Sequence, residues 1–144
     1  MATFTGKAYG KAYLALWNKE IDWDSDTISV IATTSSHTID QDAHDYVDDI
    51  TNEVSGGSYA RKTLGTKTTT YTGGSNKHAL DGADLQWTTA TFTFRHLHVA
   101  STTAGSDATR PLIGYQSGDG DTTGGGGNLD FAWNASGIIE ETVG

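Results

Sequence analysis

The 144-residue chain has no cysteine, one proline and only nine Lys and Arg against eighteen Asp and Glu. Without cysteine, disulfide bonds and thiolate metal sites are excluded. The formal net charge of −9 argues against nucleic acid as a partner, because binding to phosphates requires clustered Lys and Arg. The same charge argues against an anionic membrane surface. The composition therefore favours partners that are not polyanions.

Long apolar segments are also missing. No apolar run approaches the length of a transmembrane helix. The first residues, MATFTGKAYGK, contain neither the apolar region nor the cleavage pattern of a signal peptide, so we expect synthesis in a cytoplasm without secretion. Hydrophobic residues make up 35% of the chain, which is low for a globular domain. We therefore expect assembly to contribute part of the stability.

The length predicts one domain, and we expect a β-rich domain over residues 7–144 after an N-terminal arm over residues 1–6. Ten of the eighteen acidic residues lie between Glu20 and Glu53, and no Lys or Arg occurs from Asp22 to Ala60. One face of the protein should therefore be strongly negative. Such a face either keeps the protein soluble or docks on a basic surface of a partner.

Two stretches near the start have helical spacing. The first predicts a helix over residues 7–18, with an apolar stripe formed by Tyr9, Ala12, Tyr13, Leu16 and Trp17. We interpret its aromatic residues as core, with partner contact as the alternative, and a strand over AYLALW is the alternative to the helix. The second stretch predicts a short amphipathic helix from Asp42, whose apolar face comprises Ala43, Tyr46, Val47, Ile50 and Val54.

The rest of the chain predicts short strands separated by turns rich in Gly, Asn and Asp. The strand that begins at Ile28 is apolar on both faces, which indicates a central strand. Ser117–Gly127 (SGDGDTTGGGG) is predicted to be a mobile surface loop. The fold class is therefore mainly β, an antiparallel β-sandwich or barrel with one or two short N-terminal helices. The other expected strands are Tyr59–Leu64, Lys67–Thr72, Lys77–Leu80, Asp84–Trp87, Thr91–Ala100, Leu112–Gln116, Asn128–Trp133 and Ile138–Val143.

Three segments carry a resemblance to one family: GKAYLALWNKEIDWDSDTISVIATTSS (residues 10–36), Asp42–Leu64, and ATRPLIGYQSG (residues 108–118). They resemble small virion structural proteins of tailed bacteriophages, whose members decorate or complete the capsid or sit in the tail. The resemblance implies a structural protein, in the first place a capsid decoration (cement) protein on the capsid surface of the virion. It also implies contact with the major capsid protein and self-association as a trimer or dimer. The alternative is a tail or connector component, such as a tube, terminator or baseplate-associated protein.

A decoration protein bridges shell subunits through many weak contacts that add up by symmetry. An extended N-terminal arm can complete a neighbour's sheet edge. Lys7 and Lys11 can contact an acidic neighbouring subunit. We therefore expect partner contacts at Met1, Ala2, Thr3, Phe4, Thr5, Lys7 and Lys11.

One acidic segment partly matches the spacing of a calcium loop. The ligand positions 1, 3, 5 and 12 would be Asp119, Asp121, Thr123 and Asp130. However, position 8 is Gly126 rather than an apolar residue, position 12 is not the longer Glu, and the flanks predict strands rather than helices. We therefore expect a flexible hairpin loop here, and neither a metal nor a cofactor.

His96 and His98 are two residues apart in a predicted strand, so their side chains should point to one face, together with Phe92 and Phe94. With a carboxylate nearby they would suit a transition metal. Otherwise they are surface or interface histidines. The remaining histidines are scattered in the sequence and indicate no site: His37, His44 and His78.

Catalytic signatures are missing as well. The chain has no Gly-x-Ser-x-Gly nucleophile motif. Acidic residues are so abundant that a carboxylate pair at glycosidase separation carries no signal. We therefore expect a protein that is not an enzyme. A further alternative is a carbohydrate- or receptor-binding module, which would expose aromatic rings such as Trp87, Trp133 and Tyr115.

Overall fold

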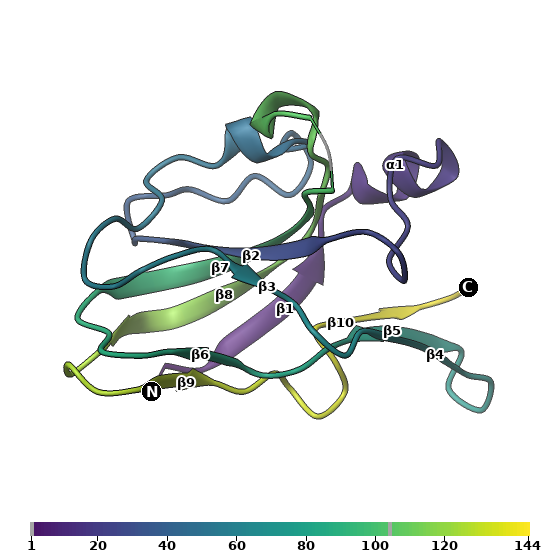
Figure 1. Ribbon diagram of the computed structural model, residues 1–144. Helices are drawn as coiled ribbons and strands as arrows, with labels where there is room; N and C mark the ends of the chain where they lie inside the picture. The colour runs from purple at the N-terminus through teal and green to yellow at the C-terminus, as the bar shows by residue number, and fades with distance from the viewer. Residues whose placement is uncertain (1, 104) are drawn as a thin grey trace.

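The computed structural model describes residues 2–103 and 105–144, which form a mainly β fold (Figure 1). Its largest part is a five-stranded antiparallel sheet, here called the large sheet. The long strands β7 and β8 pair in its middle. In spatial order its strands are β1 (Phe4–Ala8), β8 (Leu112–Thr123), β7 (Thr93–Ser101), β2 (Ile28–Thr33) and β3 (Lys62–Thr63).

Two smaller antiparallel sheets lie along one face of the large sheet (Figure 1). The three-stranded one, here called the groove sheet, has the order β10 (Ile139–Thr142), β5 (Lys77–Asp81) and β4 (Thr68–Thr72). The other pairs β6 (Leu85–Trp87) with β9 (Leu129–Phe131). The arrangement is sandwich-like. It is not a closed barrel, because β1 and β3 form the two edges of the large sheet.

A large core lies between the large sheet and the two smaller sheets. Alternation along β2 sends Ile28 and Val30 into it, as the pleat of a strand requires. Aromatic rings fill its middle, where the centroid of Phe94 lies 5.7 Å from that of Phe4 and 6.3 Å from that of Phe131. The large core therefore joins all three sheets into one folding unit.

A small core lies on the opposite face of the large sheet. Ile31 points to the face of β2 opposite Ile28 and Val30, and it packs there with Tyr9, Val47 and Leu112. Residues 34–54, here called the cover segment, cross this face and include the 3-10 helix η1 (Val47–Asp49). A second 3-10 helix, η2 (Asp107–Thr109), precedes β8. Because β2 is buried on both faces, its predicted central position is confirmed.

The predicted antiparallel, mainly β fold is confirmed, but the helix predicted over residues 7–18 is right only in its second half. Helix α1 spans Ala12–Trp17. Residues 7 and 8 instead end β1, whose backbone pairs with β8, and the Tyr9 amide still donates to the carbonyl of Ile113 (3.1 Å). Pairing with a long strand therefore outweighs the helical spacing. No helix within the two described ranges is long and apolar enough to cross a membrane.

The amphipathic helix predicted to begin at Asp42 is wrong, since only the short η1 is helical there. Its backbone groups bond to another segment instead. The Val47 amide donates to the carbonyl of Arg110 (3.0 Å), and the carbonyl of Asp45 accepts from the amide of Leu112 (2.8 Å). These partners replace the bonds that a helix would make within itself.

The ends of the large sheet correct two further predictions. The arm expected over residues 1–6 overlaps β1, because residues 4–6 pair with residues 116–118. Met1 lies outside the described residues. The mobile loop expected over residues 117–127 is wrong for residues 117–123, which extend β8. At Gly118 a Cβ would lie 2.6 Å from the Arg95 carbonyl oxygen, so this glycine permits close backbone packing rather than mobility.

Candidate functional site: an apolar groove beside α1

Helix α1 buries its small side chains and exposes its large apolar ones, which is the reverse of an ordinary surface helix; we call this inverted packing. Its small residues Ala12 and Ala15 are buried, whereas the exposed fraction of Trp17 is 82%. A surface helix normally buries its large apolar side chains and exposes polar ones. The six-residue helix α1 instead exposes four large apolar side chains, those of Tyr13, Leu14, Leu16 and Trp17.

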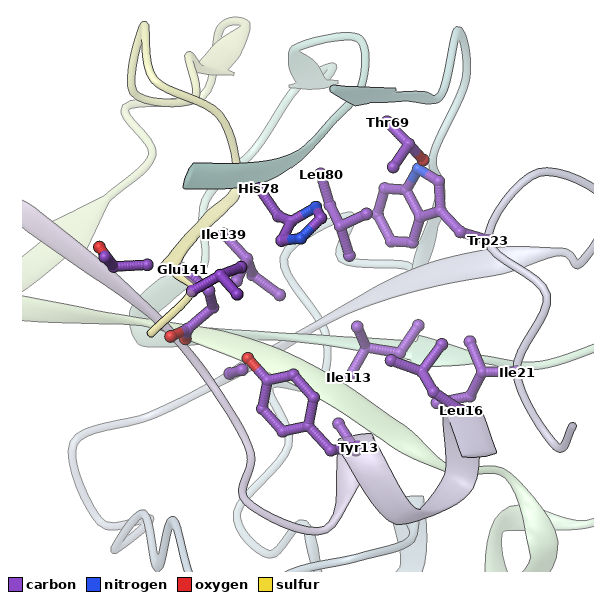
Figure 2. Close-up of a pocket in the computed structure, with 14 residues that line it drawn as sticks. Tyr13, Leu16, Ile21, Trp23, Thr69, His78, Leu80, Ile113, Ile139 and Glu141 are labelled. Atoms are coloured by element: carbon purple, nitrogen blue, oxygen red, sulfur yellow. The ribbon is translucent and has the colours of Figure 1, made fainter. Parts of the chain in front are cut away.

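An apolar groove of about 540 Å³ lies beside this helix. Figure 2 shows it between α1 and the groove sheet, with Ile21 and Trp23 at one end and Ile113 of β8 between the two walls. The groove sheet is itself weakly buried, since all five residues of β4 are exposed. The lining residues are Ala8, Ala12, Tyr13, Leu16, Ile21, Trp23, Thr69, His78, Leu80, Ile113, Ile139, Glu141, Thr142 and Val143.

Exposed apolar side chains gather around this groove. Four of them belong to α1, Val143 lines the groove, and Tyr71 shares a face of β4 with the lining residue Thr69. Single exposed apolar residues are normal on a protein surface, but a gathered set marks an interaction site. Over the described ranges, the exposed large apolar side chains are Tyr13, Leu14, Leu16, Trp17, Tyr71 and Val143.

The groove is mostly apolar, and polar side chains such as those of His78 and Glu141 enter its lining from the groove sheet. Tyr13 and Glu141 approach one another from opposite walls in Figure 2. Burial, and then the charge of Glu141, raise the pKa of Tyr13 above its ordinary value. Beyond the end of α1, Glu20, Asp22 and Asp24 are exposed. A mostly apolar groove with acidic residues nearby suits an apolar segment of a partner that is flanked by basic residues.

The residues expected to contact a partner lie in two places. Lys11 immediately precedes α1, where its Nζ donates to the Ala43 carbonyl (2.7 Å) and pairs with Asp45 (3.2 Å). This residue therefore ties α1 to the cover segment. Phe4 packs into the large core rather than reaching outward. The other described ones lie in or just before β1, where contact with a partner stays a prediction: Ala2, Thr3, Thr5 and Lys7.

The residues with calcium-loop spacing are not in one loop. They lie on strands β8 and β9, which belong to different sheets: Asp119, Asp121, Thr123 and Asp130. Asp119 accepts a hydrogen bond from the amide of Thr3 (2.9 Å), and Asp121 pairs with Arg95 (2.8 Å). Within residues 2–103 and 105–144, no group of three or more His, Asp or Glu side chains is arranged to hold a metal ion.

His96 and His98 share a face of β7, but Phe94 does not join them. The pairing of β7 with β8 is irregular between Phe94 and His96, which shifts the alternation so that Phe94 enters the large core. His98 is fully buried, so its interpretation as a surface histidine is wrong. His37 and His44, which the sequence left as isolated residues, come from the cover segment to join them.

The aromatic rings proposed for sugar binding are buried. The Trp87 ring is 1% exposed and its Nε1 donates to the Ala60 carbonyl (2.8 Å). Trp133 is likewise buried and donates to the Ala83 carbonyl (2.9 Å). Tyr115 is buried in the small core. These three rings therefore offer no exposed stacking platform. Among the aromatic rings that are exposed, those of Tyr13 and Trp17 were expected in the core.

Sequence reasoning missed the groove, although α1 contains a signal for it. Ala12 and Ala15 are three residues apart and so share one helical face. A face of small residues lets a helix pack closely on a sheet, which forces its large side chains outward. The opposite wall was not predictable, because it comes from strands near the other end of the chain.

We compared the chain with protein-family models, with curated proteins and with solved structures, and none of the three comparisons found a match.

Proposed function

We propose that this chain is a structural protein of a tailed-phage virion, a capsid decoration protein, and that it binds the major capsid protein through α1 and the apolar groove. The observation that carries the proposal is the inverted packing of α1, whose exposed Tyr13 and Leu16 line a groove that the chain does not fill. Leu14 and Trp17 are exposed elsewhere on the same helix. The virion setting rests on the sequence resemblance.

The two most exposed apolar side chains of α1 provide binding free energy of a useful size. Complete burial of a large apolar side chain contributes about 1.5–3 kcal/mol, so Leu14 and Trp17 together would support a weak but specific contact. A decoration protein does not need more for each contact, because the shell repeats the contact at many equivalent positions. Engagement of two subunits at once multiplies the effect.

The charge around the groove indicates what the bound segment should contain. The exposed acids Glu20, Asp22 and Asp24 lie next to the apolar surface of α1. We therefore expect the capsid protein to present an apolar side chain for the groove, with Lys or Arg residues on either side. Such an arrangement gives specificity and faster association, and it weakens at high salt.

The three segments that carry the resemblance lie together in the fold. The residue 10–36 segment contacts the 42–64 segment through Lys11 and Asp45 (3.2 Å) and through the Val54 amide and the Ala32 carbonyl (2.9 Å). The 108–118 segment joins them where the Leu112 amide donates to the carbonyl of Asp45 (2.8 Å). Segments distant in sequence thus build one end of the molecule, which includes α1, and this supports treating the resemblance as one structural feature.

The test measures binding to purified capsids that lack this protein, together with the copy number per native particle. We expect hundreds of copies per particle, and at least about tenfold weaker binding of Trp17→Ala. Trp17→Phe should retain most of the affinity, because it keeps an aromatic ring. Thr88→Ala, on the exposed turn after β6, serves as the matched surface control and should bind like the wild type.

Other outcomes would redirect the proposal. A few copies per particle, or a multiple of six, would assign the protein to the tail or connector. Absence from particles would refute the virion role. If Trp17→Ala abolishes a dimer or trimer seen by light scattering but leaves capsid binding unchanged, the groove is the contact between copies of this chain.

A further inference from the structure

Four of the five histidines meet beneath the cover segment. The ring centroid of His37 lies 4.8 Å from that of His98, 5.5 Å from that of His44 and 6.5 Å from that of His96. His37 and His44 belong to the cover segment, whereas His96 and His98 belong to β7. The histidine cluster, as we call these four residues, is therefore the contact between the cover segment and the large sheet.

His98 lies at the centre of the histidine cluster and is fully buried. Its Nδ1 lies 2.7 Å from the hydroxyl of Tyr9, and its Nε2 lies 3.0 Å from the hydroxyl of Thr33. Both ring nitrogens thus have neutral partners. A charged imidazolium at this position would be stabilised by hydroxyl groups alone, which is insufficient to offset the loss of water.

His37 connects the histidine cluster to the far end of the cover segment. Its Nδ1 accepts a hydrogen bond from the Thr51 amide (3.3 Å) and lies 3.1 Å from the Thr51 hydroxyl. Its Nε2 is buried without a partner. When Nδ1 takes up a proton it can no longer accept from the Thr51 amide, so protonation removes a bond within the cover segment that fixes its folded shape.

The charged groups around the histidine cluster lie at its edge, beside His96 and His44, and no carboxylate of the described residues acts on His37 or His98. On β7 and β8 the Arg95–Asp121 ion pair (2.8 Å) lies beside His96. In the cover segment Asp49 interacts with His44. Burial raises the pKa of Asp49, but hydrogen bonds from the Asp45 and Tyr46 amides outweigh it, so the pKa is lowered and the carboxylate stays charged in mild acid. Tyr9 and Tyr115 complete the surroundings as neutral phenols.

We propose that the histidine cluster is an acid-sensitive lock, which holds the cover segment on the large sheet at neutral pH and releases it in mild acid while the large core stays folded. The segment that opens is rich in Asp and is tied to the start of α1 by Lys11. This inference concerns the cover segment alone and stands whether or not α1 binds a capsid protein.

The direction of the effect follows from the pKa values. Burial, and then the neighbouring His44 and His96, lower the pKa of His37 from 6.5 to about 4. Burial is also the main cause that lowers the pKa of His96 and, much further, that of His98. The closed state therefore binds protons more weakly than the open state. Closure is complete above about pH 6.5 and is lost as the pH falls toward 4.

The expected size can be stated for His37 alone. With a pKa of 6.5 when open and about 4 when closed, acidification from pH 7 to pH 5 raises the opening constant about 20-fold. Protonation of His98 adds to this in the same direction. An increase of this size makes the open state the more populated one where the closed state is favoured by less than about 20-fold at neutral pH, and otherwise it is measured as a loss of hydrogen-exchange protection.

The experiment measures hydrogen-exchange protection factors by NMR at pH 7 and pH 5, corrected for the intrinsic exchange rate at each pH. The reporter for the lock is the Val47 amide, which donates to the Arg110 carbonyl. The reporters for the large core are the Gly124 amide, which donates to Phe92, and the Ile138 amide, which donates to Leu80. We expect protection of Val47 to fall at least about 20-fold at pH 5, and that of the other two to fall less than threefold.

Two variants distinguish the contribution of the histidine cluster to the pH response from other effects of low pH on the protein. His37→Asn keeps an oxygen that can accept from the Thr51 amide but cannot be protonated, so Val47 should lose the part of its pH dependence that His37 contributes, about 20-fold between pH 7 and pH 5. His78→Asn, on β5 outside the histidine cluster, should keep the wild-type response. The proposal is overturned if the protection of Val47 is unchanged at pH 5, if all three amides lose protection equally, or if His37→Asn responds to acid like the wild type. The first two of these results need only the wild-type protein, so they decide even if His37→Asn does not fold.

Discussion

The two faces of the large sheet differ in whether the side chains packed on them can be protonated. The large core contains 22 buried apolar residues, and the indole groups that border it donate to neutral backbone carbonyls. The small core contains seven buried apolar residues and lies beside the histidine cluster. The same sheet is therefore stabilised on one face by contacts that do not titrate and on the other by contacts that do. This division allows one face to respond to pH without loss of the fold.

The largest expected effect comes from the large core. Phe94 is fully buried between the rings of Phe4 and Phe131. Phe94→Ala should lower the free energy of unfolding by about 3–5 kcal/mol, because it removes contacts and leaves a cavity that rigid β-strands cannot close. Urea denaturation at pH 7 measures this. A loss below about 1 kcal/mol would contradict the assignment of the fold's stability to this core.

A smaller effect is expected in the small core. In Tyr9→Phe the ring stays, but Nδ1 of His98 loses its partner at 2.7 Å. A buried acceptor without a partner costs about 1–3 kcal/mol, which should appear in urea denaturation at pH 7.

Tyr9→Phe also sharpens the contrast between the two faces. If the hydroxyl of Tyr9 donates to Nδ1 of His98, the imidazole ring of His98 carries its proton on Nε2, which donates a hydrogen bond to the hydroxyl of Thr33. The Val47 amide should then lose protection in this variant, while the Gly124 amide keeps its own. Equal losses at both amides would mean that the two cores unfold together and that the comparison fails.

The sequence predicted the strands of the large core well, because each carries its own signal. Alternation with apolar residues on both faces placed β2 correctly in the centre of a sheet. Gly-rich segments were less reliable. Gly118 and Gly120 lie within β8, where Gly118 serves close packing, and local composition does not distinguish this use from a mobile loop.

The small core and the groove were not predictable, because each depends on contacts between distant segments. The apolar spacing after Asp42 does mark the buried Val47, but backbone bonds to the segment before β8 replace the helix. His37 and His98 meet only when β7 pairs with β2 and the cover segment folds over both. The position of His98 also depends on an irregular pairing after Phe94, which no alternation rule locates.

The smallest expected effect on folding belongs to a residue in neither core. Trp17 is 82% exposed, so Trp17→Ala should change the free energy of unfolding by less than about 0.5 kcal/mol. The better helix propensity of alanine offsets part of any lost contact. Urea denaturation of the isolated protein beside Phe94→Ala gives the measurement. A loss above about 1.5 kcal/mol would mean that Trp17 packs on its own chain, and weaker binding of this variant to capsids would then reflect misfolding. Unchanged stability together with weaker binding to capsids would show that Trp17 contacts a partner and does not stabilise the fold.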